Sequence, residues 1–198
     1  MADTDKLDLK KASILLLEPN VQNMAVLVQV LMGFGAKNFH RCENGDQAKT
    51  LLERTPIDMM IVEGQTAEGD PDGYDFVKWL RHSEIEPAAY IPVIITSAHT
   101  SLTNVTRARD CGAHFIVAKP LVPTVLYDRI IWVARVNRPF ITAGDYVGPD
   151  RRFKNHGPPL GTDGRRTTDL KGAVGLPQEP NMSQNEIDDL MQPAKVAL

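Results

Sequence analysis

The first two thirds of the chain alternate between short apolar runs and longer amphipathic stretches. The apolar runs are rich in Ile, Leu and Val, and they have the length of strands that are buried on both faces of a parallel sheet. Between them, apolar residues recur every three or four positions, which is the spacing of a helix with one buried face. The predicted strands are 12–17, 38–42, 57–63, 91–96 and 115–118, and the predicted helices lie near 21–31, 45–52, 74–80, 102–111 and 122–136.

This alternation predicts an α/β fold with a five-stranded, doubly wound parallel sheet. Five strand–helix repeats suit one domain, and crossovers of this length place helices on both faces of the sheet. Residues 1–10 are polar and are expected to be a flexible N-terminus, and the domain is expected over 11–136. From residue 137 the apolar periodicity stops, so we expect a disordered linker over 137–181, rich in Pro, Gly and Arg. A short amphipathic peptide, 182–192, and a flexible end, 193–198, follow.

Composition narrows the class of protein. The chain is 42% hydrophobic and 24% charged, with a formal net charge of -3, which gives no global argument for nucleic-acid binding. No apolar run approaches the length of a membrane span, and the charged N-terminus lacks a signal core. Cys42 and Cys111 have neither metal-ligand spacing nor a disulfide framework. A cytoplasmic protein with no DNA-binding domain is therefore expected.

Polar side chains stand where four of the predicted strands end. Glu18 follows the first strand, Glu63 ends the third, Ser97 follows the fourth and Lys119 follows the fifth. In a parallel sheet these ends lie side by side, at the edge where ligands bind. Such a group can bind a phosphoryl group, or it can form a buried ion pair without chemistry. The spacing alone does not choose between the two.

Several segments around these ends match a known family in order and spacing. Residues 11–136 resemble the receiver domain of bacterial response regulators, of the kind found in the chemotaxis regulator CheY. The resemblance implies a (βα)5 flavodoxin-like fold and a role in two-component, phosphorelay signalling. The matching segments are 14–18, 43–45, 57–63, 72–74, 92–98, 111–113 and 117–120.

The chain departs from the family pattern at the positions that carry the family's chemistry. Glu63 stands where the family has the aspartate that accepts a phosphoryl group, and Pro19 replaces one of two adjacent acids that hold Mg²⁺. Ile116 stands at the aromatic switch position. Glu63 is one methylene longer than Asp, so we expect it to pair with Lys119 and to accept a hydrogen bond from Ser97.

These departures predict a receiver that is not phosphorylated, has an impaired Mg²⁺ site and needs no cofactor. In this hypothesis Glu63 partly imitates the phosphorylated state. One alternative is that Glu63 and Lys119 form a purely structural pair. Another is a functional phosphorelay receiver that catalyses its own phosphoryl transfer.

Two surfaces are candidates for binding partners. The predicted helix 122–136 carries more apolar residues than one buried stripe needs, Trp132 and Tyr127 among them. With helix 102–111 and strand 115–118 it forms the face that receivers commonly use for dimerisation or target binding. A homodimer through this face is one expectation. The other is that residues 139–141 fold back and cover the surplus.

The tail beyond the domain contains paired arginines. Arg151, Arg152, Arg165 and Arg166 can grip phosphates, for instance those of a cyclic dinucleotide. This gives a third function class, a cyclic-dinucleotide effector. The alternative is a solvated linker whose charges keep it extended.

The segment 182–191 carries a more specific signal. Ser183 and Glu186 form a capping box, and Ile187, Leu190 and Met191 make an apolar edge that predicts a partner-binding helix. The segment resembles the N-terminal peptide of the flagellar motor switch protein, which docks on a chemotaxis receiver. We therefore expect it to bind a receiver domain, its own or another. The alternative is a chance capping box in a disordered tail.

Together these features predict a non-enzymatic signalling adaptor in bacterial two-component, chemotaxis or flagellar control. Its expected partners are a receiver domain and flagellar or chemotaxis components.

Overall fold

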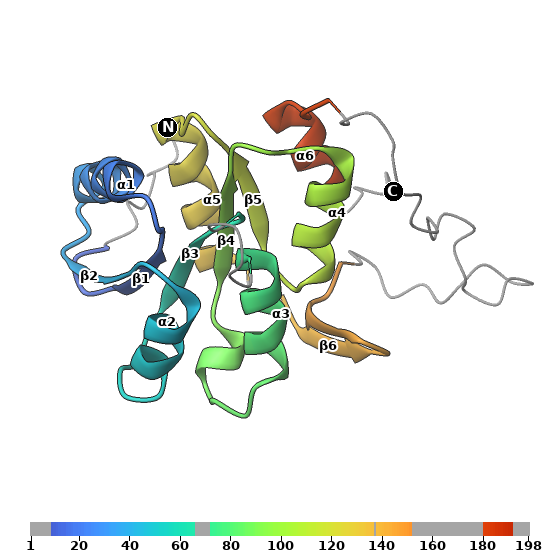
Figure 1. Ribbon diagram of the computed structural model, residues 1–198, viewed down its shortest axis with the longest axis horizontal. Coiled ribbons are helices and arrows are strands. Elements are labelled where there is room, and N and C mark those ends of the chain that lie inside the picture. The colour runs from blue at the N-terminus through green and yellow to red at the C-terminus, as the bar shows by residue number, and fades with distance from the viewer. Residues whose placement is uncertain (1–8, 66–71, 137, 152–179, 192–198) are drawn as a thin grey trace, which may run out of the picture.

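The computed structural model describes residues 9–65, 72–136, 138–151 and 180–191. Five parallel strands form one sheet in the order β2-β1-β3-β4-β5, which confirms the predicted doubly wound fold (Figure 1). The strands are β1 (Ser13–Leu17), β2 (Asn38–Cys42), β3 (Met59–Glu63), β4 (Val93–Ser97) and β5 (Phe115–Ala118). The helices that connect or follow them are α1 (Val21–Gly33), α2 (Gly45–Leu52), α3 (Gly73–His82), the short 3-10 helix η1 (Ala88–Tyr90), α4 (Leu102–Asp110) and α5 (Pro123–Arg135).

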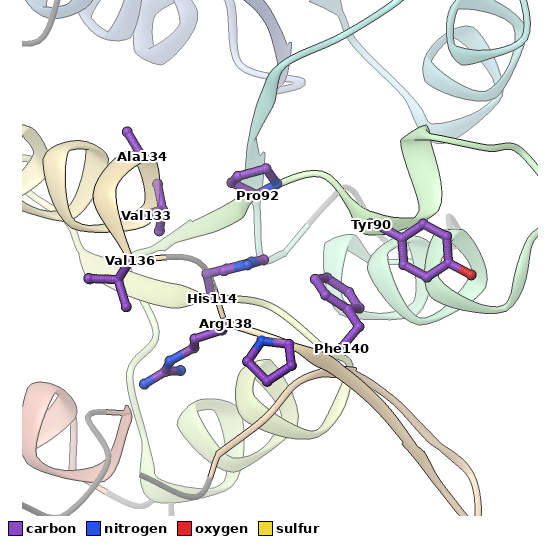
Figure 2. A pocket seen from close by; sticks show the side chains of 9 residues that line it. Tyr90, Pro92, His114, Val133, Ala134, Val136, Arg138 and Phe140 are labelled. Carbon is purple, nitrogen blue, oxygen red and sulfur yellow. The ribbon is translucent and has the colours of Figure 1, made fainter.

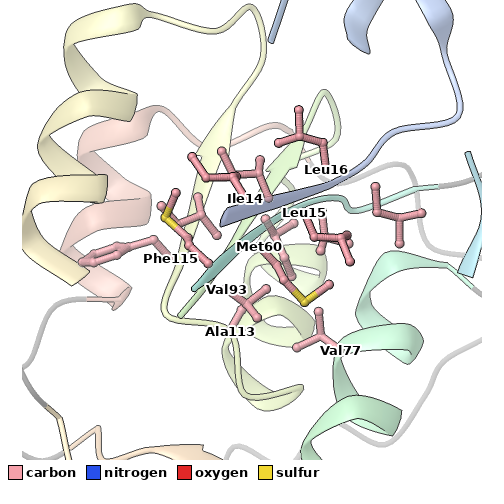
Figure 3. Packing of buried hydrophobic residues seen from close by; sticks show 14 of the residues in the cluster. Ile14, Leu15, Leu16, Met60, Val77, Val93, Ala113 and Phe115 are labelled. Carbon is pink, nitrogen blue, oxygen red and sulfur yellow. The ribbon is translucent and has the colours of Figure 1, made fainter. Parts of the chain in front are cut away.

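The core lies between the central strands and the helices on both faces of the sheet. Every residue of β3 and β4 is buried, as expected for strands covered on both sides. Figure 3 shows side chains of neighbouring strands packed together, among them Leu15, Met60 and Val93. Ile14 lies opposite Met59, and Met60 lies opposite Val93, in the parallel register. This register places the carboxyl ends of the strands at one edge.

Side-chain caps begin most of the helices directly after a strand or loop. The Asn20 side chain accepts hydrogen bonds from the first amides of α1, and Asn44, Asp72 and Ser101 do the same for α2, α3 and α4. Each cap satisfies amide groups that the helix itself leaves without partners. The caps therefore fix where each helix leaves the edge of the sheet.

A β-hairpin follows α5. Strands β6 (Phe140–Ala143) and β7 (Tyr146–Pro149) pair antiparallel around a two-residue loop. Gly144 has a φ of 60°, which a type II′ hairpin turn requires at its first central position. Our prediction of a disordered linker from residue 137 is therefore wrong for the hairpin. Residues 152–179, the rest of the expected linker, lie outside the described part of the chain.

The hairpin is fastened to the domain through the buried Arg81. This side chain is 3% exposed and donates hydrogen bonds to the carbonyl oxygens of Gly112, Ala89 and Ile91. Its guanidinium lies 5.0 Å from the centre of the Phe140 ring. Burial lowers the pKa of Arg81 to about 10, so the group stays charged at neutral pH. One charged side chain thus ties α3, the start of two strands and the hairpin together.

Two of the surplus apolar residues of α5, Trp132 and Tyr127, pack against other residues of the chain. Trp132 packs edge-on against Phe115, and Tyr127 packs on Phe34 at the end of α1. Arg138 lies over the Trp132 ring. Phe140 packs against Tyr90 and His114 at the far end of the sheet, and not along α5. Phe140 therefore does not cover α5 as expected.

A last helix, α6 (Gln184–Met191), lies beside β5 and α4 (Figure 1). This confirms the short helix predicted within 182–192. No helix in the described ranges is long and apolar enough to cross a membrane.

Candidate functional site

Lys119 joins two carboxylates at the carboxyl edge of the sheet. It follows β5 and precedes a cis peptide bond to Pro120. Its Nζ donates a hydrogen bond to Glu18 Oε2 at 2.6 Å and another to Glu63 Oε2. Both carboxylates are buried, whereas the lysine keeps slight solvent contact. The structure thus brings together three of the four predicted site residues, in the predicted pairing of Glu63 with Lys119.

The remaining carboxylate oxygens are held by the backbone. The Asn20 amide donates to Glu18 Oε1 at 3.0 Å, and the Gln65 amide donates to Glu63 Oε1 at 3.3 Å. All four carboxylate oxygens therefore accept a hydrogen bond. Asn20 and Gln65 act through their main chains, which is why no residue pattern in the sequence pointed to them.

Burial and pairing act in opposite directions on these charges. Burial raises the pKa of Glu63 above its ordinary value, and hydrogen bonding to Lys119 opposes that rise. Burial alone would lower the pKa of Lys119, but its hydrogen bonds to Glu18 and Glu63 raise it above its ordinary value. We therefore treat Lys119 as the fixed positive charge of the site.

Ser97 lies at the same edge but has other partners than expected. Its hydroxyl donates to the His99 carbonyl oxygen at 3.2 Å and accepts from the His99 amide at 3.0 Å. The predicted hydrogen bond from Ser97 to Glu63 is therefore wrong. The loop after β4 turns back on Ser97, and its backbone takes up the hydroxyl group.

A pocket of about 440 Å³ opens above the Lys119 pair. Its lining residues are Glu18, Pro19, Asn20, Asn23, Glu63, Gln65, Ala98, His99 and Lys119. Pro19 contributes no ligand atom from its side chain. The floor of the pocket is therefore formed by two acids that share one base, Lys119.

Tyr74 packs against Gly64, directly after Glu63, and was not identified from the sequence as a site residue. It is buried, and a Cβ atom on Gly64 would come within 2.7 Å of its hydroxyl oxygen. Burial raises the pKa of Tyr74 to about 12, and the Ser97 hydroxyl and Arg107 act in the opposite direction. Arg107 covers the ring at 4.7 Å and pairs with Asp72 at 2.6 Å. The hydroxyl completes no hydrogen bond of ordinary geometry with any described residue.

The glycine at position 73 fixes the approach of α3 to the site. A Cβ atom there would lie 1.9 Å from the Glu63 carbonyl oxygen, which no side chain tolerates. Gly73 also donates its amide to the Gly64 carbonyl oxygen at 3.1 Å. The backbone that carries Glu63 is therefore held directly by the start of α3.

The donor set fits Mg²⁺ poorly. Mg²⁺ needs near-octahedral oxygen ligands, commonly one or two free carboxylates. Here both carboxylates are bound to Lys119, and the neighbouring position is Pro19. Within the described residues, no three His, Cys, Asp or Glu side chains gather in a way that could hold a metal ion. A metal would have to displace the lysine from both acids.

The C-terminal segment docks on the edge strand of its own domain. The Gln184 side chain accepts a hydrogen bond from the Ala118 amide at 2.8 Å and donates one to the Ile116 carbonyl oxygen at 3.1 Å. It thus pairs with the open edge of β5 as a neighbouring strand would. Asp188 pairs with Arg129 of α5. The helix therefore lies on the face of α4, β5 and α5.

The residues before α6 hold the loop between β4 and α4. The Asn181 side chain accepts from the Thr100 amide at 2.9 Å, and its amide group donates to the Ala98 carbonyl oxygen at 3.1 Å. The Met182 amide donates to the Thr100 carbonyl oxygen at 2.7 Å. Ala98 also lines the pocket above Lys119. The tail therefore contacts a loop that borders the pocket.

The apolar contacts of α6 differ in part from the prediction. Ile187 is fully buried and Met191 is buried, but Leu190 is 39% exposed. Leu190 therefore does not anchor α6 on its own domain, because α6 presents a narrower face to the domain than its spacing suggested; its role toward another receiver stays a prediction. The capping box is confirmed: Glu186 Oε2 accepts from the Ser183 amide and hydroxyl, which lowers the pKa of Glu186.

Two further predicted site residues, Ile116 and Arg151, are engaged in contacts within the domain. The Ile116 side chain, at the expected switch position, is fully buried in the core. Arg151 lies 3.8 Å from the centre of the Tyr146 ring, and it donates to Asp110 and to the Arg109 carbonyl oxygen. These contacts contradict a free, anion-binding Arg151. The other predicted anion-binding residues, Arg152, Arg165 and Arg166, lie outside the described residues.

Comparison with known proteins identifies the domain. Residues 14–131 match the model of the response regulator receiver domain. The chain belongs to the response regulator receiver domain family. No curated protein matches the sequence.

Solved receiver structures share this fold. The receiver domain of a histidine kinase from Syntrophus aciditrophicus is 25% identical, with a TM-score of 0.56, and the match covers 67% of this chain and 98% of that one. The chemotaxis protein CheY4 of Vibrio cholerae is 19% identical, with a TM-score of 0.54 and coverage of 62% and 98%. A CheY-like receiver from Methanospirillum hungatei is 16% identical, with a TM-score of 0.52 and coverage of 61% and 90%. The hairpin and α6 lie beyond the matched receiver segment.

Proposed function

We propose that this receiver is not phosphorylated and acts as a non-enzymatic, cytoplasmic protein–protein adaptor in bacterial two-component signalling. The observation that carries the proposal is the double pairing of Lys119 with Glu18 and Glu63. An acceptor carboxylate must be free to attack a phosphoryl group. Here the carboxylate at the end of β3 is already bound to the lysine, with its second oxygen held by the Gln65 amide.

The chemistry of phosphoryl transfer supports this reading. That reaction depends on the position of the nucleophile and on metal charge, and it demands little covalent chemistry from the protein. A glutamate at the acceptor position moves the attacking oxygen by one methylene. Pro19 removes a carboxylate from the place where the family holds its metal, so we propose that the Mg²⁺ site is impaired and that no cofactor is needed.

The same pairing supports an active-like bias. In this proposal the Glu63 carboxylate stands in for part of a phosphoryl group and holds Lys119 permanently. It carries one negative charge at most, which is less than that of a phosphoryl group. The buried Ile116 cannot report a change at the site by moving between exposed and buried positions as an aromatic switch would.

Acetyl phosphate treatment followed by intact-mass measurement tests the proposal. The expected result is no phosphoryl adduct on the native chain in the presence of Mg²⁺, under conditions that modify an aspartate-bearing receiver run in parallel. The variant Glu63→Asp is the matched control, because it shortens the side chain and withdraws the carboxylate from Lys119. A phosphoryl group mapped to Glu63 would sink the proposal and favour the phosphorelay alternative.

The adaptor role is supported by the docking of α6. The face of α4, β5 and α5, which receivers commonly use for partners, is covered by this chain's own helix. We propose that a partner either binds the docked assembly or displaces α6, and that displaced α6 can bind a second receiver domain. A homodimer through the same face would need the same displacement. Chemotaxis and flagellar components are the partners that the tail resemblance favours.

The cyclic-dinucleotide alternative has less support, because Arg151 is engaged by Asp110, Arg109 and Tyr146.

A further inference from the structure

A second pocket, of about 570 Å³, lies at the opposite edge of the sheet from Glu63. It opens where β4 and β5 begin, between the end of α5 and the hairpin (Figure 2). Its size is within the range of sites for small organic molecules. Its lining residues are Tyr90, Pro92, His114, Val133, Ala134, Val136, Arg138, Pro139 and Phe140. None of them belongs to the site around Lys119.

Most of the residues that line this hairpin pocket have apolar or aromatic side chains. In Figure 2, Tyr90 and Phe140 stand on one side, and Val133, Ala134 and Val136 stand on the other. The Tyr90 and Phe140 rings meet edge to face, with their centres 5.4 Å apart. Flat rings and aliphatic side chains on facing walls suit a flat, apolar ligand body.

Arg138 gives the hairpin pocket an unused cationic donor. Its guanidinium stacks on the Trp132 ring, 4.5 Å from the ring centre. Its Nη2 is buried and has no hydrogen-bond partner in the described structure. The negative charge of Asp150 also acts on Arg138. A buried donor without an acceptor is uncommon in folded proteins and is readily satisfied by an anionic ligand.

His114 adds a neutral donor. Its Nδ1 accepts a hydrogen bond from the Val93 amide at 3.2 Å, so the proton of the neutral ring lies on Nε2. Burial, together with the positive charges of Arg81 and Arg138, lowers the pKa of His114 to about 3. The ring is therefore neutral at physiological pH and carries its proton on Nε2.

The surroundings favour negative charge in the hairpin pocket. Arg81 lies under Phe140 and bonds only to carbonyl oxygens, so its charge is not cancelled by a carboxylate. Arg81 and Arg138 both disfavour a proton on His114, which shows that their fields overlap at the pocket.

We propose that the hairpin pocket binds a small organic anion with a flat, apolar body. The anionic group accepts hydrogen bonds from Arg138 Nη2 and His114 Nε2, and the body packs between the aromatic and aliphatic walls. A bare inorganic anion would leave those walls uncovered. The site is independent of Glu63 and extends the proposed adaptor function with a ligand-binding function.

A pair of matched probes tests the proposal on the full-length chain. Indole-3-acetate carries the required charge and flat body, and indole-3-acetamide has the same shape without the charge. Amide NMR spectra are recorded during titration with each probe. We expect indole-3-acetate to shift the amide signals of Tyr90, Ile91, His114, Arg138 and Phe140, and to bind at least about tenfold more tightly than the amide. A tenfold difference corresponds to one ordinary charge-assisted contact.

Arg138→Met is the informative variant, because it keeps a long side chain over Trp132 and removes the charge. It should abolish the preference for the acid, whereas Arg54→Gln, at an exposed arginine far from the pocket, should leave it unchanged. Equal binding of the two probes, shifts elsewhere on the domain only, or an undiminished preference in Arg138→Met overturns the proposal. If Arg138→Met does not fold, the acid–amide comparison on the native chain decides alone.

Discussion

At the scale of single residues, Lys119 pairs with two buried carboxylates, one directly after β1 and one at the end of β3. Replacing it with Met leaves Glu18 and Glu63 facing each other without a counter-charge. Loss of one partner from a buried ion pair costs about 3–5 kcal/mol, and the slight exposure of Lys119 places the expected loss near 3 kcal/mol. Urea unfolding of Lys119→Met measures it.

A double variant separates lost pairing from lost packing. Adding Glu63→Gln to Lys119→Met removes one of the two unpaired charges, so part of the lost stability should return. If the single variant unfolds within about 0.5 kcal/mol of the native chain, the range of an ordinary surface change, the pair makes no net contribution to stability.

His114 makes the stability of the domain depend on pH. The pKa of His114 is about 3 in the folded chain and about 6.5 in the unfolded chain. Between these two pH values the unfolded chain binds a proton at His114 and the folded chain does not. The stability from this residue is fully present above pH 6.5 and is lost as the pH falls toward 3. Between pH 7 and 5 we expect a loss of about 2 kcal/mol from His114.

Asn at position 114 can offer an acceptor to the Val93 amide but does not titrate. Denaturant unfolding of His114→Asn across this pH range should therefore show a flatter profile than that of the native chain. Parallel profiles would show that other groups carry the pH dependence.

At the scale of elements, the docking of α6 rests on Ile187 and on the Gln184 pairing with β5. An aspartate at Ile187 would bury a charge without a partner, so we expect Ile187→Asp to release α6. The Ala118 and Thr100 amides, which donate to the tail, report docking in NMR spectra. Leu190→Asp is the matched control on the exposed side of the same helix and should leave these signals in place. Equal effects of the two variants would contradict the docking described here.

The five strands and their helices were predictable because buried parallel strands have continuous apolar sequences and the helices carry caps such as Asn20. The hairpin was not predicted, since its strands are short and half-exposed and contain Gly148 and Pro149. Gly144 and Asp145 were the available signal, because a Gly-Asp pair between two short strands fits a two-residue turn.

The residues that meet in the candidate site were predictable from the sequence, but their individual hydrogen bonds were not. The topology alone places Glu18, Glu63 and Lys119 together, because parallel strands end at one edge. The individual hydrogen bonds depend on the loops. In the loop after β4, the Ser97 hydroxyl bonds to the His99 backbone and not to Glu63. The width of the buried face of α6 depends on the surface beneath it, so the spacing alone could not show that Leu190 stays exposed.

At the scale of the whole molecule, both ends of the segment 152–179 are fixed near one helix. Arg151 is bound at the end of α4, through Asp110 and the Arg109 carbonyl oxygen. Asn181 is bound just before α4 begins, at Thr100. A helix of nine residues is about 14 Å long. The 28 residues of the segment therefore join two points that a few extended residues could bridge.

Shortening this segment should leave the docked tail in place. Deleting residues 160–171 removes twelve residues, and the cost of closing a loop changes only slowly with its length. We expect the Ala118 and Thr100 amide signals to stay at their positions in the native chain. Loss of docking on deletion would show that the segment itself contributes contacts.

The anchor of Arg151 on α4 has a further consequence for how this chain can change. Because Arg151 and Asn181 are both bound near α4, the 28 residues between them exceed the length that is needed to span that distance. Insertions, recognition motifs or modification sites can accumulate there without disturbing the domain or the helix. We therefore expect new sequence signals to be acquired between Arg151 and Asn181 while the folded parts stay constant.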